Sequence, residues 1–206
     1  MVQNFRRLPR SRWKRRCQQR MLIKKYTEPE DIVFHADIIG ASFAVMKTEG
    51  KTPNQQSLKE AAEFAAAHSR GWREGFATVD VYWVTPEQIS KTAPSGEYVP
   101  HGAFTISGKR NWMRNTPLKI AIGTILDEKT GEIKFTSGPV DAVKAKTQNY
   151  VVIVPGDINA KELSKQILKR LAEKAPKEAR EKIQKTTHEQ IRELIPYGKG
   201  TIKTQP

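Results

Sequence analysis

The sequence predicts an α+β fold: a mixed, largely antiparallel sheet with packed helices, followed by a small α/β extension at the C-terminus. Short segments with alternating or continuous apolar residues recur along most of the chain and indicate strands. Helical patterns are interspersed among them without strict strand–helix–strand alternation, which favours α+β over a parallel α/β fold. At 206 residues the chain has room for one large domain or two small ones with a real core.

The first predicted elements are two strands and a helix. Residues 31–37 and 41–47 are rich in Ile, Val and Phe and are separated by Gly40, which predicts strands joined at a break. Residues 57–60 (Ser-Leu-Lys-Glu) form a capping box that predicts the start of a helix. Its packing face carries mostly small residues at helical spacing: Leu58, Ala61, Ala62, Ala65, Ala66 and Ser69. Gly71 suits the C-terminal cap of this helix.

More strands are predicted beyond the helix. Residues 77–84 alternate cleanly, with the three odd-numbered positions that precede Trp83 apolar and on the same side as this residue. Trp83 therefore belongs with the core. The strand pattern continues in four later segments, namely residues 103–107, 118–126, 132–135 and 150–154. Residues 127–131 are expected to form a hairpin loop.

A second region is predicted from residue 119 onward. Its buried strand leads through Pro155 and Gly156 into a helix over residues 160–174, with Asn159 as the N-cap. The apolar stripe of this helix consists of Leu163, Ile167 and Leu171. A second capping box at residues 187–190 predicts another helix, and the alternating Lys and Glu of this region favour a solvated helix surface.

Charge points to a polyanionic partner. The net charge is +14 and the isoelectric point is about 9.9, which favours nucleic acid or an anionic membrane. No apolar run approaches the roughly 20 residues that span a bilayer, and no signal-peptide h-region is present. The single cysteine, Cys17, excludes an internal disulfide framework and fits a reducing cytoplasm. A basic cytoplasmic protein is most economically an RNA binder.

The basic residues are concentrated at the start of the chain. Residues 1–20 hold eight Lys and Arg without any acid, while the remainder holds 28 Lys and Arg against 22 Asp and Glu. We therefore divide the chain into a basic lead segment (residues 1–22), a first domain (23–118) and a C-terminal extension (119–206). The lead segment is interpreted either as a disordered arm that docks on RNA or as a frameshifted start. A frameshift is considered because codons can be chosen for residues 13–20 that, read one base out of frame, encode Gly-Asp-Ala-Ser-Lys-Glu.

Residues 108–114 (Gly-Lys-Arg-Asn-Trp-Met-Arg) combine cations, an amide and an aromatic ring. Lys and Arg contact phosphates, and an exposed ring stacks on bases. The alternative is a basic turn with Trp112 packed inward. Lys91 lies in a loop that exposes it, and we expect it to converge with this segment on the turn at residues 40–42.

Several residues also allow catalytic interpretations. His35 and Asp37 lie on the same side of a strand, about 7 Å apart by strand rise, which is compatible with a metal site or an acid–base pair. No third metal ligand is evident, and a triad with Ser42 lacks a nucleophile elbow. Gly156 precedes a helix, but Asp157 would face a bound phosphate there. Hydrogen bonding within the turn or to a phosphate is the commoner use of such groups.

Four motifs resemble the RNA-binding domain of the NFACT proteins. They are the His-Ala-Asp strand at residues 35–37, Gly-Ala-Ser at 40–42, Trp-x-x-Pro-x-x-x-x-Lys at 83–91, and Gly-Lys-Arg-Asn at 108–111. The resemblance covers about residues 21–118 and weakens toward the C-terminus. One departure is Ile39, where many relatives have a histidine. The family's N-terminal domain and long coiled coil are missing from the resemblance, so the tailing of stalled peptides is not assigned to this chain.

The resemblance implies a noncatalytic module that binds RNA, namely tRNA or ribosomal RNA, and the large ribosomal subunit, with neither membrane nor DNA as a partner. No cofactor and no metal are expected. The expected RNA-binding residues are His35, Asp37, Gly40, Ser42, Lys47, Lys91, Lys109, Arg110, Asn111 and Arg114. Two alternatives remain: an RNA-processing or RNA-modifying enzyme that uses His35 and Asp37 as acid and base, and a ribosome-associated protein-interaction domain.

Overall fold

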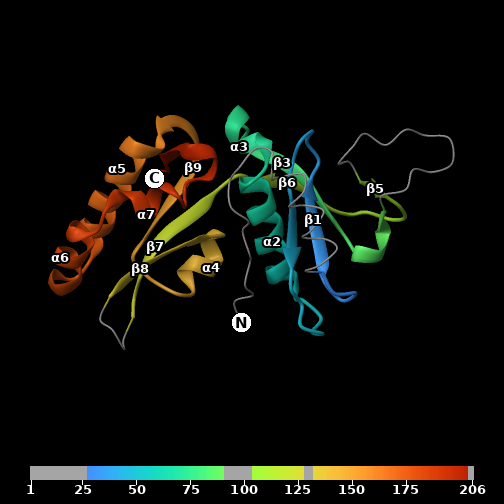
Figure 1. Cartoon of the computed structure of the whole chain (residues 1–206), viewed down its shortest axis with the longest axis horizontal. Coiled ribbons are helices and arrows are strands. Elements are labelled where there is room, and N and C mark those ends of the chain that lie inside the picture. The colour runs from blue at the N-terminus through green and yellow to red at the C-terminus, as the bar shows by residue number, and fades with distance from the viewer. Residues whose placement is uncertain (1–26, 91–103, 128–131, 204–206) are drawn as a thin grey trace.

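The computed structural model describes residues 27–90, 104–127 and 132–203, and within these residues it confirms the α+β prediction. Two four-stranded sheets, antiparallel throughout, lie in the two halves of an elongated molecule (Figure 1). The predicted lead segment, Lys91 and most of the predicted hairpin loop lie outside the described residues. Within the described residues, every helix is too short or too polar to cross a lipid bilayer.

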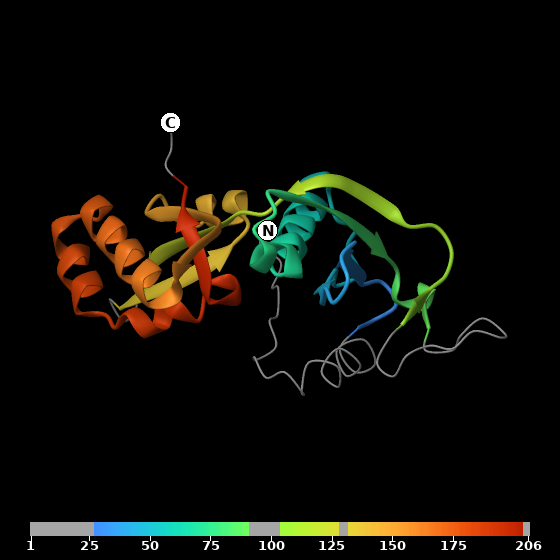
Figure 2. The ribbon, with the colours of Figure 1, turned by 90° about the horizontal axis from the view of Figure 1, so that it is seen from above.

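The first sheet has the strand order β2-β1-β3-β6. Its strands are β1 (Ile32–Ala36), β2 (Phe43–Met46), β3 (Thr78–Val84) and β6 (Asn111–Pro117). Helix α2 (Gln55–Ala67) packs against all four strands and covers one face of the sheet (Figure 2). On the other face, a small two-stranded ribbon of β4 (Ile89–Ser90) and β5 (Thr105–Ile106) packs against part of the sheet.

Helix α2 begins earlier and ends sooner than its sequence pattern predicts. Its N-cap is Asn54, whose side-chain oxygen accepts a hydrogen bond from the Ser57 N–H at 2.8 Å, so the predicted capping box does not start the helix. The predicted alanine face is buried as expected. Gly71 is not its cap: it lies in the short helix α3 (Arg70–Glu74), where a Cβ would approach Val79 Cγ1 to 2.8 Å.

The second sheet has the order β10-β9-β7-β8. Its strands are β7 (Ile120–Leu126), β8 (Ile133–Gly138), β9 (Tyr150–Asn159) and β10 (Lys199–Ile202). The helices of this half are α4 (Val140–Lys144), α5 (Ala160–Lys174), α6 (Lys177–Lys185) and α7 (His188–Arg192). Short 3-10 turns lie at Pro86–Gln88 (η1) and Pro196–Gly198 (η2).

The predicted helix over residues 160–174 is confirmed. Asn159 caps α5 by accepting a hydrogen bond from the Glu162 N–H at 3.1 Å, and the predicted Leu-Ile-Leu stripe is fully buried. Strand β9 continues through Pro155 and Gly156 instead of ending before them, because β10 pairs along it. Thr187 makes no side-chain cap bond, although α7 does begin at the next residue.

One main core joins the two halves. Phe34 of the first sheet, Ile120 and Ile153 of the second sheet and Leu163 of α5 are all fully buried and belong to the same apolar cluster. A second, smaller cluster lies on the opposite face of the first sheet, where β4 and β5 cover buried residues of β1 and β3. The sheet is therefore buried on both faces at that end, and its remaining outer face carries the candidate site.

Candidate nucleic-acid interface

Four ring-bearing side chains form a row across the first sheet, on the face opposite α2. His35 of β1 pairs in register with Phe43 of β2 and with Tyr82 of β3, and Tyr82 pairs with Trp112 of β6. Residues directly opposite one another on antiparallel strands project to the same face. The row therefore crosses all four strands from one edge to the other.

The rings of this row are in direct contact. Their centroids are 4.9 Å apart between Phe43 and His35, 5.6 Å between His35 and Tyr82, and 5.1 Å between Tyr82 and Trp112. These separations lie in the range of stabilising aromatic pairs. Phe104, which precedes β5, adds an edge contact to Phe43 at 5.4 Å.

Two arginines, one just before β6 and one within it, lie over the rings at one end of the row. The guanidinium carbon of Arg110 is 4.9 Å from the centroid of Tyr82, and that of Arg114 is 3.9 Å from the centroid of Trp112. Both distances are within the range of cation–π attraction. The cationic segment that the sequence singled out is therefore mostly the start of an edge strand, with its even-numbered side chains on the outer face.

The side chains of the row differ in their exposure to solvent. Tyr82 is only 5% exposed, whereas Trp112 is 36% exposed. Of the two alternatives for Trp112, the structure therefore supports the ring that is open to solvent. Trp83 packs partly buried against the main core, as its position in the alternation predicted. Trp112 is thus an aromatic side chain of the row that a ligand can reach.

Asp80 of β3 connects the arginine end of the site to the turn after β1. Its carboxylate accepts hydrogen bonds from Arg114 at 2.6 Å and from the Asn115 N–H at 2.8 Å, and these bonds hold its pKa below the ordinary value. Its backbone carbonyl accepts a hydrogen bond from the Asp37 N–H at 2.8 Å. Asn115 has a φ of 51°, beside the irregular register where β3 meets β6.

The turn after β1 holds three of the predicted residues. Asp37 and Gly40 are exposed and Ser42 is half-buried. Gly40 has a φ of 80°, a left-handed conformation that glycine adopts without a steric penalty. Ile39, where the family resemblance led us to note a missing histidine, is 87% exposed. This turn lies next to His35, one strand away from β3 and two from β6.

His35 is half-buried beneath its neighbours in the row. Burial lowers the pKa of its imidazole below the ordinary 6.5, and a backbone hydrogen bond of Ala41 and the charge of Asp37 oppose this shift only in part. Its Nδ1 atom is buried without a hydrogen-bond partner among the residues that the structure describes. The ring is therefore neutral near pH 7 and serves as part of the apolar row.

A side chain that the sequence did not single out holds the cationic turn in place. The Gln88 amide donates to the carbonyls of Ser107 at 2.8 Å and Lys109 at 3.0 Å, while its oxygen accepts from the Thr85 N–H at 3.1 Å. Gly108 has a φ of 73°, and a Cβ there would meet the Gln88 nitrogen at 2.9 Å. Gln88 lies inside the Trp-x-x-Pro-x-x-x-x-Lys motif at residues 83–91, but its partners are about twenty residues away, which motif spacing does not reveal.

The structure brings together most, but not all, of the predicted residues. Lys109 and Arg110 are exposed, and neither forms an ion pair with a carboxylate in the described part of the chain. The Asn111 amide is directed to the carbonyl of Trp83 at 3.4 Å. Lys47 lies past the far end of β2 and pairs with Asp31 at 2.7 Å and Glu28 at 3.1 Å.

Lys47 is therefore separated from the row, and two carboxylates compensate its charge. The predicted partner Lys91 lies outside the described residues. Within the described ranges, no three His, Cys, Asp or Glu side chains are grouped so that they could hold a metal ion.

Comparison with known proteins shows which family part of the chain resembles. Residues 14–108 match the family described as NFACT protein RNA binding domain. An archaeal Rqc2 homolog, aRqcH of Methanocaldococcus jannaschii, is 48% identical over 137 residues, which is 66% of this chain and 20% of that protein. The human ribosome quality control complex subunit NEMF is 39% identical over 97 residues, which is 47% of this chain and 9% of that protein.

Among solved structures, the C-terminal part of a fibronectin/fibrinogen-binding protein from Streptococcus suis is 27% identical, with a TM-score of 0.41. The match covers 50% of this chain and 38% of that one. The chain spans a fifth or less of the two ribosome quality control relatives described above.

Proposed function

We propose that the chain binds tRNA, large-subunit ribosomal RNA or both in ribosome quality control, because residues 14–108 match the NFACT protein RNA binding domain and the relatives include ribosome quality control proteins. The observation that carries this proposal is the outer face of the first sheet, where a partly exposed row of rings ends beside Arg110 and Arg114. Cations attract the phosphate backbone, and exposed rings accept bases, so the two together suit RNA.

The proposed interface consists of the start of β6 and the turn after β1, on either side of the row. Lys109 and Arg110 supply the positive charge, since both are exposed and neither is compensated by a carboxylate in the described residues. The turn at residues 37–42 offers exposed backbone close to His35. Lys91 remains a proposed contact, while Lys47 is a weaker one because Asp31 and Glu28 pair with it.

We further propose a noncatalytic role in the cytoplasm, in association with the large ribosomal subunit. His35 packs between two rings, a position that suits the sheet face better than proton transfer to a substrate. A turnover assay with the RNA that crosslinks to the chain in cells tests this proposal. Cleavage or modification of that RNA, lost in His35→Ala and Asp37→Ala, would show an enzyme instead.

The binding proposal is tested by salt dependence. RNA affinity of the chain should fall steeply as salt rises, because neutralised phosphates release counterions. The triple variant Lys91→Ala, Lys109→Ala and Arg110→Ala should bind more weakly and lower the salt slope by roughly one unit for each phosphate that is no longer neutralised. Its thermal stability should hardly change, because exposed charges contribute little.

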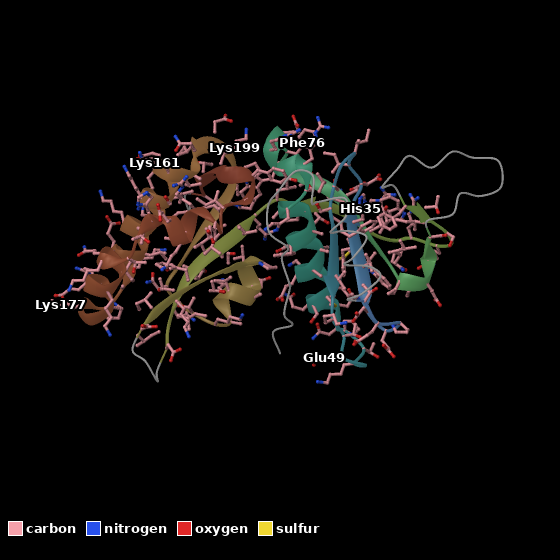
Figure 3. The ribbon with its side chains drawn as sticks, viewed as in Figure 1. His35, Glu49, Phe76, Lys161, Lys177 and Lys199 are labelled. Atoms are coloured by element: carbon pink, nitrogen blue, oxygen red, sulfur yellow. The ribbon has the colours of Figure 1, made fainter. Side chains whose placement is uncertain are left out.

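A matched control removes the same charge elsewhere. Lys161, Lys165 and Lys169 are exposed on α5, in the half of the molecule that holds the second sheet. Figure 3 shows Lys161, the first of them, away from His35. Their triple alanine variant should bind RNA nearly as well as the unmodified chain. If instead the α5 variant loses affinity and the first variant does not, the interface belongs to the C-terminal helices and the proposed site is wrong.

A further inference from the structure

We propose that Trp112 and Arg114 form a stacking platform for an unpaired base, so that the preferred RNA is single-stranded or looped and not a continuous duplex. This inference rests on the proposed RNA-binding function and names the kind of RNA that the same site selects. It depends on the geometry of one end of the row, where the exposed ring and the arginine meet.

The guanidinium of Arg114 is held in place before any ligand arrives. It lies 3.9 Å from the centroid of Trp112, and Asp80 anchors it by a hydrogen bond of 2.6 Å. Asp80 is itself held by the Asn115 N–H. An arginine that is already ordered loses less conformational entropy when a ligand binds, so its flat surface is prepared for stacking.

The pairing with Asp80 also argues against Arg114 as a phosphate ligand. Its charge is already compensated by a carboxylate, because its Nη1 group donates a hydrogen bond to Asp80. Its side chain is nevertheless 57% exposed. What the pair of Trp112 and Arg114 presents to solvent is therefore a flat, polarisable surface with little net charge, and RNA offers bases to such a surface.

In this proposal, residues next to the platform contact the phosphates. Arg110 lies just before β6, two residues before Trp112, and its guanidinium lies over the Tyr82 ring on the same face. Lys109 precedes it in the turn. Neither shows an ion pair with a carboxylate in the described ranges. The site thus places cations for the backbone on one side of a platform for a base.

A duplex cannot use such a platform. In an A-form helix the bases stack on one another and the deep major groove keeps side chains from their faces. Only an unpaired base in a loop, a bulge or a single strand can leave its own stack and lie on the side-chain pair. Stacking of this kind typically contributes enough affinity that its loss by alanine substitution weakens binding roughly 5- to 150-fold.

The experiment measures affinities of the full chain for three probes of equal length. They are a short oligoadenylate, a blunt duplex RNA and a ribose-phosphate oligomer that lacks bases. The unmodified chain should bind the oligoadenylate most tightly. Trp112→Ala should lose roughly 5- to 150-fold for the oligoadenylate and little for the other two probes, with the same salt slope. Trp112→Phe retains a ring and should recover most of the loss.

The outcomes separate this inference from the proposed function. Equal affinity of the unmodified chain for all three probes, or an equal loss for all three in Trp112→Ala, overturns the platform while leaving RNA binding in place. Failure of every probe to bind at low salt overturns both. Unchanged melting temperatures in the two variants ensure that an affinity loss reflects the site and not the fold.

Discussion

The indole N–H of Trp72 donates a hydrogen bond of 2.8 Å to the backbone carbonyl of Lys199, across 127 residues of sequence. Trp72 is fully buried in α3, and Lys199 begins β10, the edge strand of the second sheet. The neighbouring Gly200 is closely packed within the second sheet, since a Cβ there would lie 3.0 Å from the Val154 carbonyl oxygen. The C-terminal half is therefore built into the same core as the RNA-binding domain.

We expect the chain to unfold in one transition, and Trp72→Phe to destabilise all of it. The substitution keeps an aromatic ring but removes the donor and leaves the Lys199 carbonyl without its partner, which costs about 1–3 kcal/mol. Denaturant unfolding followed by circular dichroism measures the change. Trp112→Phe at the exposed position is the control, with an expected change within about 0.5 kcal/mol. Two separate transitions, with only one of them shifted, would contradict the shared core.

Gln88→Ala should weaken RNA binding with little loss of stability. The amide joins Ser107 and Lys109 to Thr85, so its removal lets the cationic turn move. Water can replace these partly exposed hydrogen bonds, and the stability cost should be about 1 kcal/mol. Affinity should fall while the salt slope stays constant, because no cation is removed. The matched control is Gln56→Ala, which removes an exposed side-chain amide from α2 and should leave affinity unchanged.

Asp80→Asn should change the salt dependence and the base preference of RNA binding more than its affinity. Without the carboxylate, Arg114 is freed from its position over Trp112 and becomes available to a phosphate. We expect the salt slope to steepen by roughly one unit, and the preference for oligoadenylate over the oligomer without bases to decrease. Asp157→Asn makes the same charge change at an exposed residue of β9 and should alter neither quantity. An unchanged preference in Asp80→Asn would show that the ion pair does not orient the platform.

His35 should make the protein less stable in mild acid. Because burial lowers its folded-state pKa below 6.5, the unfolded chain binds more protons as pH falls through 6.5 toward the folded pKa. Stability is therefore fully present above about pH 6.5 and is lost below it, down to the folded-state pKa. His35→Phe keeps the ring contacts and should remove this part of the pH dependence. Chemical denaturation over pH 5–7 measures it, with the unmodified chain as the reference.

Local patterns in the sequence determined much of this structure. The spacing of Leu163, Ile167 and Leu171 and the cap at Asn159 predicted α5 correctly, because the periodicity and the cap both act within a few residues. Segments rich in Ile, Val and Phe located β1 and β2, and an alternating segment located β3, each to within a residue or two. The motifs around His35, Trp83 and Gly108 likewise pointed, from residue types and spacing alone, to the family that matches residues 14–108.

Tertiary structure alone decided how those pieces meet. The row from Phe43 to Trp112 depends on the register of four strands, and no local pattern states which residue lies opposite which. The pairing of Lys47 with Asp31 and the bracing of Lys109 by Gln88 arise between segments that are distant in the sequence. The extension of β9 through Pro155 required the unpredicted partner β10. Sequence periodicity predicts which side of a helix or strand is buried. Which residues lie in contact is decided only when strands from different parts of the chain pair and pack.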